Sequence, residues 1–230
     1  MKAGKKWTAA LPILAGAMWG SAGVFVRKLY AFGMDSYTIL ATKMCVGAVI
    51  LFLILLCWKP KLLRVRWQDL WIFLGSGILG MLGLNYCYNE AIRTVSMSLA
   101  AVLLGLSPIF VMLLSAVLFR EKITARKLGC MALALVGCLL VSGVLEGSGL
   151  QWSWGGIGMG VLSAFFYALY AIFSKTASNR GYDTFTIIFY SILAISLVLL
   201  PLTDWGSFGA FLAEAPVGNT VFTLAHAAFT

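Results

Sequence analysis

Seven long runs of apolar residues, separated by short polar segments, dominate the chain. Each run holds about 20 residues or more, which is enough for a helix to cross roughly 30 Å of hydrocarbon. Backbone groups in lipid must be satisfied within their own segment, so each run predicts a membrane-spanning helix. An eighth run begins near Pro216 and is cut off by the end of the chain. The seven predicted spans cover residues 8–28, 36–58, 69–92, 95–118, 125–144, 155–176 and 184–203.

The segment between the first two spans recurs between the sixth and the seventh. Residues 33–39 (GMDSYTI) return 148 positions later as residues 181–187 (GYDTFTI). Five spans precede the restart, and because that number is odd, the second copy should enter the bilayer from the opposite side. Such inverted repeats are typical of transporters. We therefore expect an all-α integral membrane protein of the ten-span type, an inverted repeat of five-helix units with repeat 1 at 1–145 and an incomplete repeat 2 at 153–230.

The repeat also predicts where the second copy stops. The same offset maps Thr230 onto Leu82, in the middle of the third predicted span. We therefore expect the chain to be truncated within the eighth span, with roughly sixty residues of the second copy absent.

Composition and charge agree with a membrane protein. With 61% hydrophobic residues, 11% charged residues and a mean hydropathy of +0.96, the polar residues are too few to cover a water-soluble globule. The net charge of +9 does not indicate nucleic-acid binding, because the basic residues lie in alternate loops. With the N-terminus inside, the outer segments keep only Arg27, Lys28 and Arg93. This bias predicts a multi-pass protein of the cytoplasmic membrane with a cytoplasmic N-terminus.

No motif for a metal, a nucleotide or catalysis is apparent in the sequence. The five cysteines lie in apolar sequence without metal-ligand spacing, which favours small hydrophobic side chains within helices. The Gly-x-x-x-x-Gly-Lys-Ser/Thr loop that binds nucleotides is missing. We expect no catalytic residue, no metal and no cofactor. The expected partners are the lipid bilayer and a small-molecule substrate, with no nucleic acid, and a homodimer is an open alternative.

The fourth and fifth spans resemble a known family. Residues 98–110 (SLAAVLLGLSPIF) form a small-residue segment with a central proline, residues 118–122 (LFREK) end a helix with a Glu and a basic loop, and Gly129 and Gly137 follow. This pattern is similar to that of the EamA-type drug/metabolite transporters, which usually have Arg where this chain has Lys43. The resemblance implies a ten-helix inverted-repeat transporter of small organic metabolites, often outward, across the bacterial cytoplasmic membrane.

Polar and aromatic side chains inside the spans are the candidate substrate-binding residues, because lipid does not accept polar faces. The third span ends in one polar face, and the sixth carries a stripe with two tyrosines. Pro108 should bend the fourth span. Trp19, which the offset aligns with Tyr167, should be the matching group of the other half. The candidates are Trp19, Asn85, Tyr86, Asn89, Glu90, Pro108, Ser163, Tyr167 and Tyr170, with Lys43 as a charge partner.

The candidate charges allow two interpretations. Glu90 could bind a cationic substrate group or carry a proton, or it could form a structural ion pair with Arg93 or Lys43. Lys43 could contact substrate or extend its amine toward the membrane surface. The leading functional hypothesis is a secondary transporter of amino-acid-like or drug-like metabolites, acting in export by alternating access. The alternatives are a membrane scaffold or assembly subunit and an intramembrane lipid-modifying enzyme, for which the sequence supplies no catalytic cluster.

Overall fold

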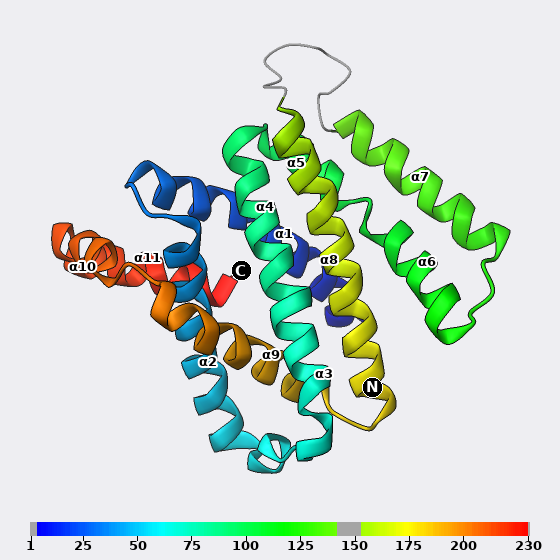
Figure 1. The fold of residues 1–230 in the computed structure, drawn as a ribbon, viewed down its shortest axis with the longest axis horizontal. Helices are drawn as coiled ribbons and strands as arrows, with labels where there is room; N and C mark the ends of the chain where they lie inside the picture. Colours follow the sequence, from blue (N-terminus) through cyan, green and yellow to red (C-terminus); the bar gives the residue numbers. More distant parts are fainter. Residues whose placement is uncertain (1–3, 142–152, 230) are drawn as a thin grey trace.

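A computed structural model describes residues 4–141 and 153–229 of the chain, and these residues form helices joined by short turns (Figure 1). The prediction of an all-α protein is confirmed for this part of the chain. Five segments are long and apolar enough to cross a membrane, namely Ser36–Trp58, Trp67–Thr94, Met97–Phe119, Trp154–Asn179 and Thr184–Leu202. Each coincides with a span that the sequence predicts.

The remaining predicted spans are also helical. The first and fifth fall on α1 and α7, and α11 begins at Pro216 as expected. Residues 142–144 of the predicted fifth span lie outside the described residues. A short helix, α10, was not predicted. The elements are α1 (Gly4–Ala31), α2 (Ser36–Trp58), η1 (Pro60–Leu63), η2 (Trp67–Asp69), α3 (Leu70–Leu74), η3 (Gly75–Leu82), α4 (Gly83–Thr94), α5 (Met97–Leu104), α6 (Ser107–Phe119), α7 (Ala125–Val141), α8 (Trp154–Asn179), α9 (Thr184–Leu199), η5 (Leu200–Leu202), α10 (Trp205–Glu214) and α11 (Pro216–Phe229).

The two copies of the repeated segment fold into the same turn. Gly33 and Gly181 have positive φ angles of 95° and 86°, which favour glycine because other residues would bring their Cβ too close to the backbone. Two residues later, the carboxylates of Asp35 and Asp183 accept backbone amides and cap α2 and α9. The helix before each turn ends in the same pair of backbone hydrogen bonds. In the first copy, Gly33 donates to the carbonyl of Tyr30 and Met34 to that of Leu29. In the second copy, Gly181 donates to the carbonyl of Ser178 and Tyr182 to that of Ala177.

The two turns lie at opposite ends of the third span, which comprises α3, η3 and α4. Beside the first turn, the Ser36 hydroxyl donates to the carboxylate of Glu90, near the end of α4. Beside the second turn, Arg180 and Tyr182 donate to the carboxylate of Asp69, just before α3. The helices that flank the repeated segment therefore turn back at opposite faces of the bundle.

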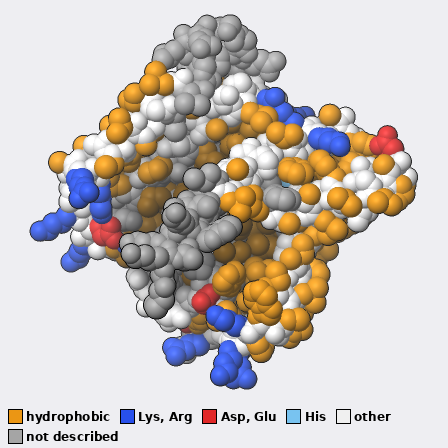
Figure 2. All heavy atoms as spheres, turned by 180° about the vertical axis from the view of Figure 1, so that it is seen from behind, with side chains coloured by type: hydrophobic (Ala, Val, Ile, Leu, Met, Phe, Trp, Pro, Cys, Tyr) orange, Lys and Arg blue, Asp and Glu red, His pale blue; other side chains and the backbone are white. Residues whose placement is uncertain are grey.

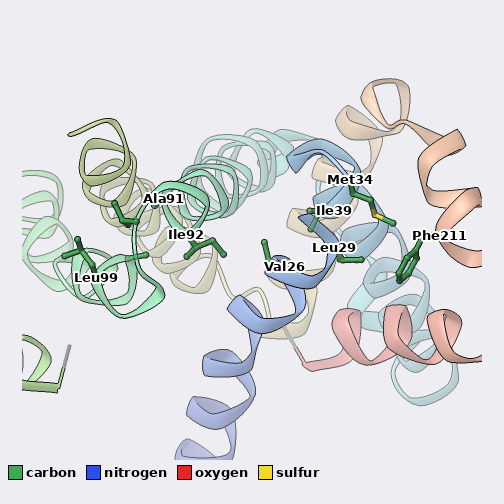
Figure 3. Packing of buried hydrophobic residues seen from close by; sticks show 10 residues of the cluster. Val26, Leu29, Met34, Ile39, Ala91, Ile92, Leu99 and Phe211 are labelled. Atoms are coloured by element: carbon green, nitrogen blue, oxygen red, sulfur yellow. The ribbon is translucent and has the colours of Figure 1, made fainter. Parts of the chain in front are cut away.

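The largest apolar core surrounds the first of these turns. Figure 3 shows Val26 and Leu29 of α1 near Ile39 of α2, with Ile92 of α4 on one side and Phe211 of α10 on the other. All five side chains are at most 5% exposed. Because the cluster takes residues from α1, α2, α4, α5 and α10, it fixes one end of the bundle.

The fourth span is broken where the sequence places Pro108. α5 ends at Leu104, and α6 begins at Ser107 with the proline in its first turn. Proline has no amide hydrogen, so position 108 cannot donate to the carbonyl of Leu104. Gly105 and Leu106 form the turn between the two helices. The predicted bend therefore coincides with an interruption of the α-helix over two residues, Gly105 and Leu106.

The third span contains a π-helix that the sequence analysis did not predict. η3 runs from Gly75 to Leu82 and packs, with α4, against α8. Figure 1 shows α4 and α8 side by side in the centre of the fold. A Cβ atom added at each of three glycines would lie 2.6 or 2.7 Å from α8, so only glycine permits this approach. The pairs are Gly75 with the Phe173 ring, Gly80 with the Tyr170 backbone and Gly83 with the Phe166 ring.

The outside of the bundle is apolar. Figure 2 shows hydrophobic side chains spread over the visible face, with Lys and Arg in a few separate groups. Val24, Val117 and Leu133 are 62%, 77% and 74% exposed. Contact of such a surface with water is unfavourable, whereas the hydrocarbon of a bilayer is as apolar as these side chains.

The close approach at Gly80 generates a stability prediction. Gly80→Ala places a methyl group against the Tyr170 backbone, which cannot move away without shifting α8. We expect a loss of about 1–3 kcal/mol, as for other overpacked cores, measured as a lower Tm in detergent. Gly158→Ala on α8 is the matched control, because its methyl group meets no atom within 4 Å. An equal Tm for the two variants would contradict the packing described above.

Candidate functional site

Lys43 and Asn85 form a polar contact inside the bundle. Lys43 is the single charged residue of the span Ser36–Trp58, and its ammonium donates to Asn85 Oδ1 of α4 at 3.3 Å. The Asn85 amide in turn donates to the carbonyl of Met81 at 2.7 Å. These bonds hold the amide so that its oxygen faces the ammonium. Lys43 therefore meets a neutral amide, and no described acidic residue forms an ion pair with it.

Aromatic side chains and α11 border this contact. Tyr37 stacks on Tyr86 with a ring separation of 5.2 Å. His226 of α11 is 1% exposed and stacks on Phe25 of α1 at 5.5 Å. α11 packs on α2, and His226 interacts electrostatically with Lys43. Helices α1, α2, α4 and α11 pack against one another in this region and contribute both polar groups and aromatic rings to it.

Glu90 belongs to a second polar cluster at the end of α4. Its carboxylate accepts from Ser36 and from the Tyr30 hydroxyl, the latter at 3.4 Å, and it pairs with Arg93 at 3.5 Å. Tyr30 comes from α1 and Ser36 from the first turn of α2, so the cluster joins three helices. Of the two partners that the sequence suggested for Glu90, the structure brings Arg93 to it, whereas Lys43 bonds to Asn85.

A cavity lies among α6, α7 and α8, beside the break in the fourth span. Its volume is about 950 Å³, and Pro108, Met112 and Tyr167 line it together with other apolar residues. Glu121, Lys122, Arg126 and Lys127 line its charged end. The structure therefore places Pro108 and Tyr167, two predicted site residues, on one cavity. Figure 1 shows α6 and α7 on one side of the α4–α8 pair, with α2 and α11 on the other.

Ion pairs lie at the charged end of the cavity. The Glu121 carboxylate accepts from Lys175 at the end of α8 and from Lys127 of α7, the latter at 3.4 Å. The hydrogen bond from Lys175 is the main cause that lowers the pKa of Glu121 below its ordinary value of 4.5. Glu121 therefore ties the loop between α6 and α7 to α8 while it is ionised.

The other predicted residues whose side chains are described do not line the cavity, and none bonds to Lys43 or to Glu90. Asn89 is 3% exposed, and its Nδ2 has no hydrogen-bond partner among the described atoms. Ser163 is buried and donates to the carbonyl of Gly160 in its own helix at 2.6 Å. Tyr170 lies where α8 meets Gly80, with its ring 6.5 Å from that of Tyr167. Trp19 lies within α1, and its side chain is outside the described residues.

Several residues of these clusters were missed by the sequence analysis. Tyr30, Ser36 and Lys175 lie at helix ends, where polar residues are common and give little signal. Glu121 stood in the family pattern, but its partner on α8 is 54 residues away in the sequence. Contacts over that distance depend on the packing of helices, which periodicity does not determine.

Comparison with known proteins identifies the class. Membrane-length helices that hold polar side chains and a broken helix inside the bundle are typical of membrane transport proteins. The model of the EamA-like transporter family matches residues 6–143, more than half of the chain. The chain belongs to this family, and the predicted resemblance is confirmed. It is a multi-pass membrane protein of a transporter family.

Relatives and a solved structure agree with this assignment. An uncharacterized transporter of Archaeoglobus fulgidus is 26% identical over 197 residues, which are 86% of this chain and 67% of that protein. The pseudopaline exporter CntI of Pseudomonas aeruginosa is 27% identical over 198 residues, 86% of this chain and 66% of the exporter. The chain thus spans about two thirds of these relatives. One crystal structure shares the fold, with a TM-score of 0.59 at 17% identity, covering 93% of this chain and 76% of the other.

The ion pairs of Glu121 generate a pH prediction. Because the pKa of Glu121 is lowered in the folded state, its contribution to stability is present above pH 4.5 and is lost as the pH falls through the lowered pKa. Glu121→Gln should lower Tm slightly at pH 7, and this difference should shrink as the pH falls below 4.5. Glu214→Gln at the exposed end of α10 controls for the loss of a charge. A Tm difference that persists at acidic pH would show that ionised Glu121 is not the stabilising form.

Proposed function

We propose that this protein is a secondary transporter that moves small organic metabolites, amino-acid-like or drug-like, out of the cell across the cytoplasmic membrane. The pseudopaline exporter among its relatives supports the export direction. Transport proceeds by alternating access, in which the two halves of the protein rock around a central site. The leading alternative is a membrane scaffold without transport, which would not need a cavity within its helices.

The cavity beside Pro108 is the observation that carries this proposal. Its volume of about 950 Å³ lies within the range of small-molecule sites, roughly 300–1,000 Å³. Its lining is mainly apolar, and Tyr167 adds an aromatic ring with one hydroxyl. The break at Pro108 supplies a hinge beside it. A metabolite with an apolar body and a few polar groups fits this chemistry.

The arrangement of the repeated turns supports the inverted repeat. The turns at Gly33 and Gly181 have the same bonds and caps, yet they lie at opposite ends of the third span. Two copies that enter the membrane from opposite sides produce this geometry. In a complete inverted repeat, α2 and α9 are equivalent helices, and they pack against each other in the structure.

Charge supports a cytoplasmic N-terminus. The loop between α2 and η2 carries Lys59, Lys61, Arg64 and Arg66, and Arg180 follows α8 on the same side. Basic loops stay preferentially on the cytoplasmic side. In this orientation the charged end of the cavity, at Glu121, opens toward the cytoplasm, and the Glu90 cluster closes the outer end of α4. The protein is then ready to accept a substrate from inside.

Tyr167 provides a test of the transport site. We expect cells that express the protein to tolerate at least one member of a panel of toxic amino-acid analogues and antimetabolites, and Tyr167→Ala to remove that resistance. Loss of the ring should weaken transport about tenfold, which corresponds to about 1.4 kcal/mol. Phe185→Ala on the exposed face of α9 is the control, because it removes an aromatic ring outside the cavity. Equal resistance for both variants at equal membrane levels would exclude Tyr167 from the site.

Pro108 provides a test of the hinge. Pro108→Ala restores an amide that can bond to the carbonyl of Leu104 and should join α5 and α6 into one straighter helix. We expect transport to fall about tenfold, a change of about 1.4 kcal/mol in the barrier, while the folded protein persists. Pro201→Ala, in the short helix after α9, is the control. Full transport by Pro108→Ala would show that the break serves packing alone.

A further inference from the structure

A second cavity lies where the loop after α2 meets the turn between α8 and α9. Its volume is about 390 Å³. Four basic residues line it, and one acidic residue, Asp183, is present. We call it the basic pocket and define it by Lys61, Arg64, Arg66, Arg180, Tyr182 and Asp183.

Hydrogen bonds between distant segments build the frame of this pocket. The Tyr182 hydroxyl donates to Asp69 at 2.6 Å and accepts from the amide of Arg66 at 3.2 Å. Thr186 donates to the carbonyl of Leu62 at 2.8 Å, and Tyr190 to that of Leu63 at 2.7 Å. The partners are more than 110 residues apart in the sequence, so the folded protein holds the two segments in a fixed relation.

The positive charge of the pocket is largely uncompensated. Asp69 is 5% exposed and pairs with Arg180, and the Asp183 carboxylate caps α9 by accepting from the amide of Phe185. Lys61, Arg64 and Arg66 form no ion pair with a described residue. Arg66 also attracts the nearby Asp69 carboxylate, but Lys61 and Arg64 have no acidic partner among the described residues and can meet an anion at this opening.

The pocket lies at the level of the membrane surface. The spans that end at Trp58 and Asn179 and those that begin at Trp67 and Thr184 all terminate around it. Trp58 and Trp67 are 83% and 88% exposed, and tryptophan prefers the headgroup region of a bilayer. The phosphates of lipid headgroups are at this depth, and clustered Lys and Arg at the cytoplasmic surface recognise them.

We propose that the basic pocket binds a phosphate group, and that its source is the headgroup of an anionic phospholipid. The guanidinium groups of Arg64 and Arg66 suit the oxygens of a phosphate diester, and Lys61 adds a third charge. A lipid bound here bridges the loop after α2 and the α8–α9 turn, which belong to different halves of the chain. This site is independent of the proposed transport cavity, with which it shares no lining residue.

The test uses the purified full chain in a neutral detergent. Its Tm is measured during titration with dihexanoyl phosphatidylglycerol, dihexanoyl phosphatidylcholine or inorganic phosphate. We expect the anionic lipid to raise Tm at concentrations at which the zwitterionic lipid does not, and the double variant Arg64→Gln/Arg66→Gln to require about tenfold more of it. Both side chains are exposed and only the backbone of Arg66 bonds to Tyr182, so the variant keeps the frame.

The double variant Lys59→Gln/Arg120→Gln is the matched control, because it removes two exposed basic residues that do not line the pocket. A response of this control like that of the wild type supports the site. An equal Tm rise with inorganic phosphate alone would support the phosphate site and overturn the lipid as its source. Equal responses to the two lipids, or equal losses in the two double variants, would overturn the proposal, since general attraction to basic loops would then explain the data.

Discussion

The close contact between the third span and α8 determines the rest of this structure. Large aromatic residues of α8 lie directly on glycines of η3 and α4, and no other residue type would leave room for them. The glycines at 80 and 75 are five residues apart, a spacing that the wider turn of a π-helix brings onto one face. Dispersion contacts add up over such a surface and hold helices together in lipid, where apolar side chains gain nothing by leaving the solvent.

This contact leaves the two ends and another face of α8 for other contacts. One face meets the glycines, and another presents Tyr167 to the cavity beside α6 and α7. The last turns of α8 carry Lys175, which bonds to Glu121, and lead to Arg180, which bonds to Asp69. A single helix thus connects the cavity, the third span and the basic pocket. A displacement of α8 would therefore change the cavity, the third span and the basic pocket together.

The sequence predicts the elements well because each signal is local. Length and apolarity predict the spans, Pro108 predicts a bend where the helix is interrupted, and the repeated segment predicts that the same connection recurs in the second copy. The π-helix is not predicted, because the glycines of a membrane segment do not indicate which helix they will pack against. The candidate site is less predictable. Lys43 bonds to Asn85, and Tyr167 lines a separate cavity. Which residues become neighbours depends on how the helices pack, and the spacing of residues within one helix does not determine that.

The ion pairs on α8 differ in a way that indicates which contact yields first. Lys175 and Glu121 are each 38% exposed, so water screens their attraction and the pair adds little to stability. Asp69 is only 7% exposed in its side chain and accepts from both Arg180 and Tyr182, so separating it would leave a buried carboxylate without partners. The bond between Lys175 and Glu121 is therefore easier to break than the bond between Arg180 and Asp69.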